Sequence, residues 1–241
     1  MSRRAALMLA TIAAQVAWIV ALRRSGLEPR DAPVLRGVMV YGPALVINSV
    51  SLFVALRYKL FTPAELGLRR PAWAMRHSRA WFALVLLAVF IAAALVDFVT
   101  PLAAMTANGM AYEDIVEHVR GHEYRYTYGR LAPPPAAWNI AVEFIKAVVV
   151  APLDEELPYR ALFVPVALSK LSRGHTALAS GAIFFLVHWL AYGAQAHPVY
   201  FLSGWLFAWA FMWAGLPAAL AAHGGENFGS SMLGTLSAFV R

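Results

Sequence analysis

The sequence predicts an all-α, polytopic membrane protein, a transmembrane helix bundle with seven spans, or eight if the long fourth one divides. Hydrophobic residues make up 61% of the 241 residues and charged residues only 14%, whereas soluble domains typically carry about 25% charged residues. The apolar residues gather in runs of about 20 residues, enough to cross ~30 Å of hydrocarbon at ~1.5 Å per residue. The basic residues form short clusters between these runs, as in the loops that set membrane topology.

Each apolar run is expected to be one membrane-spanning helix. The first is interpreted as an uncleaved helix rather than a signal peptide, because a basic pair and many further runs follow it. The seven runs cover residues 5–22, 37–56, 80–105, 136–168, 177–193, 199–213 and 217–240.

Two segments depart from this simple pattern. Residues 106–135 are polar and end in three prolines, so a loop is expected, with a short surface helix near 113–120. The run 136–168 contains Pro152 and Pro158, each of which removes a main-chain donor, so it should be one long, kinked or broken helix. We divide the single membrane domain into N-terminal spans and loops, 1–135, and a catalytic core, 136–241.

Composition also limits the function and location. The absence of cysteine excludes disulfides, thiolate catalysis and Cys-ligated metal. The net charge of +7 is explained by loop clusters, so no nucleic-acid partner is expected. Basic residues favour, by a small margin, an N-terminus inside. The Ala-, Arg-, Leu- and Val-rich composition is typical of a high-GC bacterium and predicts a multi-pass protein of the bacterial inner (cytoplasmic) membrane.

The first candidate motif lies within the run 136–168, where an ionisable side chain costs at least ~2.5–3.5 kcal/mol on insertion scales. Glu156 and Arg160 are four residues apart, so they can pair on one helix face and offset each other's loss of hydration. Glu155 points about 100° away and lacks this partner. Such a carboxylate is suited to general-base chemistry. The alternative is that both carboxylates merely line a helix end beside an aqueous cleft.

Two further motifs follow on later runs. Phe184 and His188 share one helix face, and so do His223 and Asn227. Taken singly, each is explained by a hydrogen bond to a neighbouring helix. His223 and Asn227 could also stabilise a developing oxyanion. The two glycines between them give room for close approach of a backbone or a substrate.

Depth in the membrane relates the three motifs. If helices end at residue 168 and begin at 177 and 217 on one face, Glu155 lies ~20 Å from that face, His188 ~16 Å and His223 ~9 Å. Glu155 and His188 are therefore expected at similar depth. His223 joins them only if its helix begins earlier or dips inward.

The same residue types also suit a metal centre, because zinc takes three ligands from histidines and carboxylates and leaves a place for water. The alternative zinc ligands would be Glu156, His188 and His223. Arg160 is expected to occupy Glu156, and the sequence contains no His-Glu-x-x-His helix. The favoured expectation is therefore a site without a cofactor, with zinc as the alternative.

The three motifs, in this order on successive runs, resemble the CPBP family of intramembrane endopeptidases, which includes the CAAX prenyl proteases and the bacterial Abi-type proteins. The resemblance covers about residues 136–240 and implies a helical fold with a water-accessible polar cavity. It implies acid–base roles for Glu155 and His188 and an oxyanion hole of His223 and Asn227. The supporting residues would be Glu156, Arg160 and Phe184, the last as part of the pocket wall.

The sequence departs from the family pattern at two positions of the first motif. Pro158 is unusual inside it, and Ala161 stands where family members often have glycine. Both changes bear on the local helix and hence on the placement of Glu155 relative to Arg160.

The predicted function is hydrolysis of a peptide bond near the C-terminal or membrane-tethered end of a protein, by a water that Glu155 and His188 activate. The expected partners are a membrane-anchored protein or lipidated peptide as substrate, and membrane lipids. A protein-sorting protease that cuts C-terminal anchors with metal dependence is an alternative. A non-catalytic membrane scaffold is another, and a third is a proton-coupled carrier with Glu143, Lys146 and Glu155 as relay groups.

Overall fold

The computed structural model describes residues 1–27, 33–121, 135–193 and 197–239. Within these ranges the chain is built from helices and contains no strand, which confirms the all-α prediction. The elements are α1 (Arg3–Ser25), α2 (Pro33–Arg57), α3 (Ala72–Met75), α4 (Arg79–Ala107), α5 (Tyr112–Val119), α7 (Ala137–Ile145), η2 (Lys146–Val150), α8 (Ala151–Glu156), η3 (Leu157–Leu162), α9 (Phe163–Leu168), α10 (Arg173–Tyr192), α11 (Val199–Ala214) and α12 (Leu216–Ser237).

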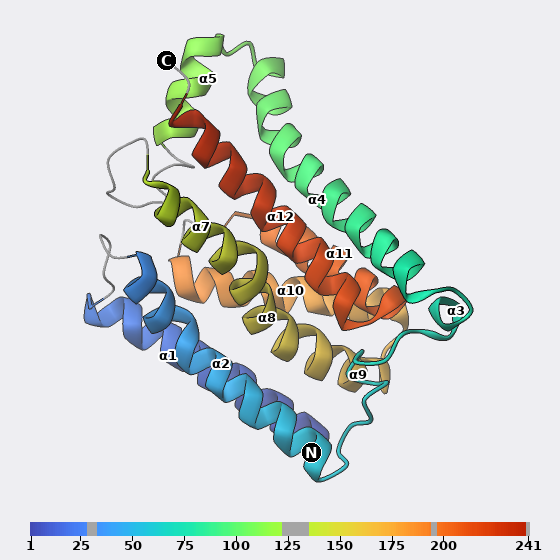
Figure 1. Cartoon of the computed structure of the whole chain (residues 1–241). Helices are drawn as coiled ribbons and strands as arrows, with labels where there is room; N and C mark the ends of the chain where they lie inside the picture. The colour runs from blue at the N-terminus through green and yellow to red at the C-terminus, as the bar shows by residue number, and fades with distance from the viewer. Residues whose placement is uncertain (28–32, 122–134, 194–196, 240–241) are drawn as a thin grey trace.

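Every predicted apolar run is helical (Figure 1). Among the described residues, four helices are long and apolar enough to cross a membrane, namely those at Arg3–Ser25, Val34–Arg57, Arg79–Ala107 and Arg173–Ala191. Val199–Ala214 is a shorter apolar helix. Several apolar helices support an integral membrane protein, and the number of spans stays a prediction. The last expected run ended at residue 240, which lies outside the described residues.

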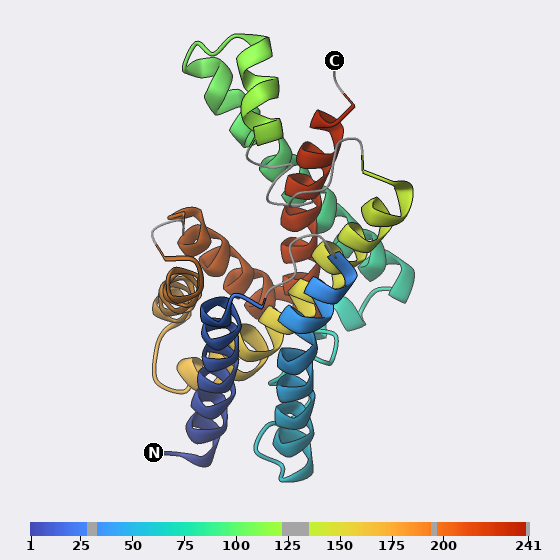
Figure 2. The same cartoon turned by 90° about the vertical axis from the view of Figure 1, so that its left-hand side faces the viewer.

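The short helix expected near 113–120 is present as α5, at the far end of α4 (Figure 2). Ile115 and Val119 of α5 are buried in one cluster with Leu233 of α12. The guanidinium of Arg120 donates to the carbonyl of Ser237 at 3.1 and 3.2 Å. Residues 122–134, the remainder of the expected polar loop, lie outside the described residues.

The run 136–168 forms one rod without an intervening turn, in the order α7, η2, α8, η3 and α9 (Figure 1). The segments η2 and η3 are π-helical and flank the six residues of α8. Pro152 and Pro158 each remove a main-chain donor in or beside these segments. The prediction of one long, interrupted helix is confirmed, and the interruptions are π turns, which occur often at functional sites.

Helix α12 packs between α4 and the rod, and its glycines allow both contacts. A Cβ on Gly224 would lie 2.8 Å from the carbonyl oxygen of Val148 on η2, and one on Gly229 would lie 2.5 Å from that of Ala94 on α4. Gly225 contacts the carbonyl of Phe90 on α4 in the same way. Small residues permit this close approach of helices in membranes. The space predicted at the Gly-Gly pair is therefore used by two backbones.

The loop between α2 and α3, residues 58–71, covers the start of α12. This contact bears on the depth of His223. Phe61 and Leu66 of this loop are buried, and the carbonyl of Gly67 accepts from the N–H of Leu216 at 3.1 Å. Gly67 and Gly215 both have left-handed backbones, with φ of 67° and 79°, which glycine adopts without a steric penalty. The α12 helix begins beneath this loop, and Nε2 of His223 lies 3.9 Å from Oε2 of Glu155, so His223 is level with Glu155, as in the alternative in which its helix dips.

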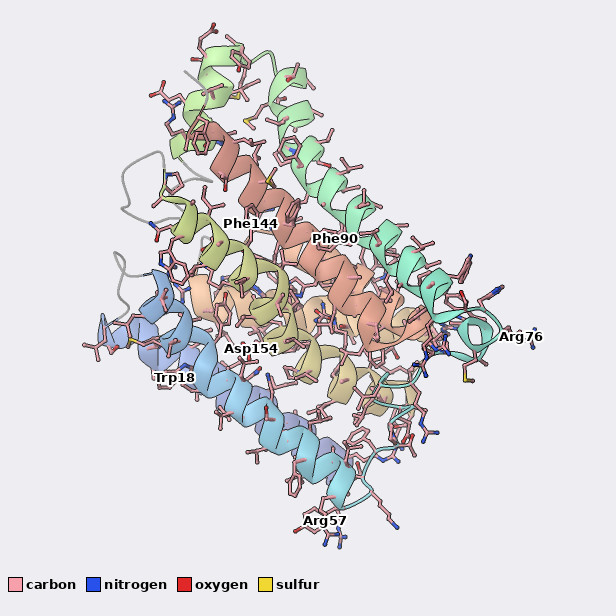
Figure 3. The ribbon with its side chains drawn as sticks, viewed as in Figure 1. Trp18, Arg57, Arg76, Phe90, Phe144 and Asp154 are labelled. Carbon is pink, nitrogen blue, oxygen red and sulfur yellow. The ribbon has the colours of Figure 1, made fainter. Side chains whose placement is uncertain are left out.

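Helices α1 and α2 form an antiparallel pair beside the rod (Figures 1 and 2). Thr11 Oγ1 donates to Ser51 Oγ at 2.7 Å. Further along, the indole N–H of Trp18 donates to the carbonyl of Met39 at 3.1 Å. This pair closes the side of α8 that carries Asp154 (Figure 3).

Candidate active site

Glu155 lies on the short helix α8, where its carboxylate faces two histidines. Its Oε2 atom is 3.7 Å from Nε2 of His188 on α10 and 3.9 Å from Nε2 of His223 on α12. Both distances exceed a direct hydrogen bond. The Glu155 side chain is 21% exposed, but its Oε2 atom is buried and has no hydrogen-bond partner among the described residues. The structure therefore brings together three of the four residues predicted to be catalytic.

Glu156, the next residue of α8, is fully buried. Its Oε2 is 3.1 Å from Nε of Arg160, and its Oε1 is 2.9 Å from Nδ1 of His223. The i,i+4 spacing predicted the ion pair with Arg160. The contact with His223 spans 67 residues, and no spacing in the sequence indicates it. Glu156 thus both neutralises a buried cation and orients the imidazole of His223.

Arg160 is held between two aromatic rings. Its guanidinium carbon lies 4.5 Å from the ring centroid of Phe184 and 5.2 Å from that of Phe207, within the range of cation–π attraction. Phe184 is 2% exposed and is not among the residues that line the described cavity. This ring therefore supports Arg160 and also lies 4.4 Å, centroid to centroid, from the ring of His188, and its place in the pocket wall stays a prediction.

The surroundings of His188 determine its tautomer. Nδ1 lies 2.8 Å from the carbonyl oxygen of Phe184, and a carbonyl only accepts, so Nδ1 carries the proton. In the neutral imidazole Nε2 is then an acceptor. The ring stacks on Tyr200 of α11 with centroids 4.1 Å apart. His188 therefore presents a lone pair to the space beside Glu155.

His223 is fixed in a similar way by different partners. Its ring stacks on Phe207 with centroids 4.7 Å apart, and Nδ1 contacts Glu156 as described. A carboxylate paired with Arg160 accepts hydrogen bonds, so Nδ1 of His223 is the donor. Its remaining nitrogen, Nε2, faces Glu155.

Asn227 contacts the main chain of the rod. Its side-chain amide donates to the carbonyl of Ala147 at 2.9 Å. This carbonyl lies in η2, where the N–H of Ala151 is turned to Lys146, and Pro152, the next residue, has no N–H to offer. Asn227 thus supplies a donor that the rod lacks, one helical turn beyond His223.

Residues 137–229 match the family described as Rce1-like, type II CAAX prenyl endopeptidase Rce1-like. The chain carries an Rce1-like domain. The match confirms the resemblance drawn from the three motifs and supports a membrane protease of the CAAX type in general. The chain gave no match to the curated proteins or to the solved structures.

A second polar cluster adjoins the Rce1-like domain from outside its limits. Gln15 of α1 and Asn48 of α2 both hydrogen-bond to Asp154, the residue before Glu155. All three side chains are buried. The three sequence motifs do not include Gln15, Asn48 or Asp154 and so did not indicate this cluster. The available signal was the presence of two amide side chains in apolar runs, where a polar group requires a partner.

A cavity lies beside Glu155 between α1, α2, α8, η3 and α10. Its polar lining includes Gln15, Asp154, Glu155 and His188, and its walls are largely aliphatic, with residues such as Val16 and Val187. The cavity thus adjoins the Rce1-like domain and the N-terminal helix pair together. The structure thus has a cavity within the helix bundle with polar groups on a mostly apolar wall, and its access to water stays a prediction.

A metal ion at this site would need several side-chain donors around one point. Among the described residues, no group of three or more His, Asp or Glu side chains is arranged to hold a metal ion. Of the three predicted zinc ligands, Glu156 already contacts Arg160 and His223. The Nε2 atoms of His188 and His223 face Glu155 instead. The zinc alternative stays a prediction.

Glu143 and Lys146, the other members of the carrier hypothesis, form an ion pair with each other on the rod. Both lie within the Rce1-like domain, in α7 and at the start of η2. Among the described residues neither contacts Glu155, so the three groups do not form a contiguous relay.

Proposed function

We propose that the protein hydrolyses a peptide bond near the C-terminal or membrane-tethered end of a membrane-anchored protein, with Glu155 as the general base. The observation that carries the proposal is the convergence of Glu155 Oε2 with Nε2 of His188 and of His223. A carboxylate and two imidazoles around one point can bind and deprotonate a water molecule.

In the first step, a water hydrogen-bonded to Glu155 and His188 attacks the carbonyl carbon of the scissile bond. Glu155 takes one proton from this water as the new C–O bond forms, and the carbonyl electron pair moves onto oxygen. The acceptor nitrogen of His188 holds the second hydrogen of the water. Fixing the attacking atom in this way removes the entropy of bringing it to the carbonyl.

In the second step, the tetrahedral intermediate collapses and the C–N bond breaks. The leaving nitrogen takes the proton that Glu155 had accepted, so one water is consumed and a carboxylic acid and an amine are released. Glu155 returns to its starting form and acts first as base and then as acid.

The oxyanion is stabilised by His223 and Asn227. In this role His223 carries protons on both nitrogens, with Nδ1 donating to Glu156 and Nε2 to the oxyanion. Asn227 has two N–H groups, and one of them is directed to Ala147 in the described structure. We infer that the other serves the intermediate, since preorganised donors at the developing charge are a large source of rate acceleration.

The cavity supports a substrate that reaches the site from the membrane. Its aliphatic walls favour apolar side chains next to the scissile bond. The matched family is described as type II CAAX prenyl endopeptidase Rce1-like, so a lipidated C-terminal peptide is the proposed substrate class. A bacterial inner-membrane location and the processing of C-terminal anchors remain proposals from composition.

Purified protein in lipid nanodiscs and an internally quenched peptide with a farnesylated cysteine near its C-terminus provide the test. We expect Glu155→Gln to lower kcat by at least about 100-fold, the size expected of a general base. Glu143→Gln, a buried carboxylate on the same rod but outside the site, should stay close to wild type and serves as the matched control.

A chelator arm separates the metal alternative. Activity that persists with chelator supports the metal-free mechanism, and activity that is lost and then restored by zinc supports the zinc alternative. Full activity in Glu155→Gln would contradict the proposal. Normal function of this variant in cells would instead support the non-catalytic scaffold.

A further inference from the structure

The carbonyl of Asp154 lacks its usual helical donor. In an α-helix it would accept from the N–H four residues later, but that residue is Pro158, which has none. A buried carbonyl without a partner is destabilising, and here side chains replace the lost donor. Asn48 Nδ2 donates to it at 2.7 Å, and Gln15 Nε2 is 3.3 Å away.

The same two amides also hold the side chain of Asp154. Its Oδ1 accepts from Asn48 Nδ2 at 3.0 Å and from Gln15 Nε2 at 3.3 Å. Gln15 further donates to Asn48 Oδ1 at 2.8 Å, which fixes the direction of the Asn48 amide. We call Gln15 and Asn48 the amide clamp. Both ends of Asp154, main chain and side chain, are thus tied to α1 and α2.

This attachment lies one residue from Glu155, on a helix of six residues with a π segment at each end. Because α8 is continuous with a π segment at each end, the direction in which its side chains point depends on how the rod is held at this place. Glu155 must nevertheless face two histidines on α10 and α12, and a displacement of about 1 Å at a catalytic group can lower the rate by about 100-fold.

We propose that the amide clamp positions Glu155, so that Gln15 and Asn48, outside the Rce1-like domain, are positioning residues for hydrolysis. The inference rests on the proposed function of Glu155. The clamp replaces the donor that Pro158 removes, and through Asp154 it sets the rotation of α8. The N-terminal helices then contribute to the geometry of the active site and are more than a membrane anchor.

The chain provides a matched control. Thr11 and Ser51 form another buried α1–α2 hydrogen bond, 2.7 Å long, that does not reach α8. Asn48→Ala and Ser51→Ala each remove one side chain from the α1–α2 contact. We expect Asn48→Ala to lower kcat by about 10- to 100-fold with little change in KM. Ser51→Ala should leave kcat near wild type, and the two variants should have similar Tm. Equal kcat in the two variants would overturn the proposal.

A double-mutant cycle tests the link to Pro158. Pro158→Ala supplies a main-chain N–H four residues after Asp154, so loss of Asn48 should matter less in that background. We expect the kcat loss caused by Asn48→Ala to shrink by at least about threefold, a coupling that separate packing effects do not produce. Additive losses would contradict the role of the orphan carbonyl.

A measurement without substrate keeps the two proposals distinguishable. In full-length protein in nanodiscs labelled with ¹⁵N-histidine, Asn48→Ala should shift the Nε2 resonance of His188, which faces Glu155, and Ser51→Ala should not. An unchanged resonance in both variants overturns the clamp whatever the activity. Full activity of Glu155→Gln, by contrast, defeats the proposed function.

Discussion

Pro152 and Pro158 of the rod each leave a main-chain carbonyl without an N–H donor from the helix. Side chains from opposite sides of the rod supply the missing donors. At Pro152 the carbonyl of Ala147 receives its donor from Asn227, inside the Rce1-like domain. At Pro158 the carbonyl of Asp154 receives donors from Gln15 and Asn48, outside that domain. Helix α8, which carries both glutamates, is therefore held between α12 on one side and α1–α2 on the other. A family domain can depend on the surrounding chain for the geometry of its site.

The largest effect is expected between the two prolines, at Glu156. Glu156→Gln leaves Arg160 as a buried cation without its carboxylate, and breaking a buried ion pair in this way costs about 3–5 kcal/mol. The free energy of unfolding in detergent should fall by that amount. The comparison variant is Glu65→Gln, because Glu65 pairs with Arg4 at 2.7 Å in a far more exposed place. A change below about 1 kcal/mol for Glu156→Gln would contradict the role given to this carboxylate.

At Pro152, Asn227→Ala removes both the donor to Ala147 and the proposed oxyanion donor. We expect kcat to fall by about 100- to 1,000-fold, the loss typical for one oxyanion donor. This loss exceeds the one expected at the amide clamp, where no group touches the substrate. Ser237→Ala, a buried hydroxyl further along α12, is the control. A kcat within about threefold of wild type in Asn227→Ala would remove Asn227 from the oxyanion hole.

The two prolines can be compared directly. Pro152→Ala combined with Asn227→Ala should recover only a minor part of the lost kcat, because the oxyanion donor is still missing. Pro158→Ala combined with Asn48→Ala should recover most of it, because that amide acts only through the helix. Double-mutant cycles on kcat measure both couplings. Equal recovery at both prolines would mean that the two amides have the same role.

The smallest effect is expected at Glu65, which pairs with Arg4 at the start of α1 and lies outside the membrane segments. The N–H of Thr62 donates to the Glu65 carboxylate at 2.8 Å and, with Arg4, holds the pKa of Glu65 below its ordinary value of 4.5. A lowered pKa means that this stabilisation is present above pH ~4.5 and is lost as the pH falls through the folded pKa. Glu65→Gln should therefore lower Tm slightly at pH 7, and the difference should vanish in acid. Its kcat should not change, unlike that of Asn48→Ala, and a lowered kcat would show that any loosening of α1 disturbs the site.

Much of the fold follows from local patterns in the sequence. The apolar runs predicted every long helix, and the i,i+4 spacing predicted the pair of Glu156 and Arg160. The convergence of Glu155, His188 and His223 was only partly predictable, because the depth of His223 depends on how the Gly67 loop covers the start of α12. The prolines indicated that donors are lost on the rod. They did not indicate that Asn227, Gln15 and Asn48 replace them, since such contacts join helices far apart in the sequence.

The central claim is that Glu155 activates water for direct attack on the peptide bond. Wild type and Glu155→Gln should be compared in single-turnover reactions in H₂¹⁸O, with a library of membrane-anchored C-terminal peptides read by mass spectrometry. The account predicts that wild type forms products whose new carboxylate carries one ¹⁸O from the first turnover, and that Glu155→Gln forms none. Products from Glu155→Gln, or a first-turnover carboxylate without ¹⁸O because Glu155 itself attacked the carbonyl, would contradict it.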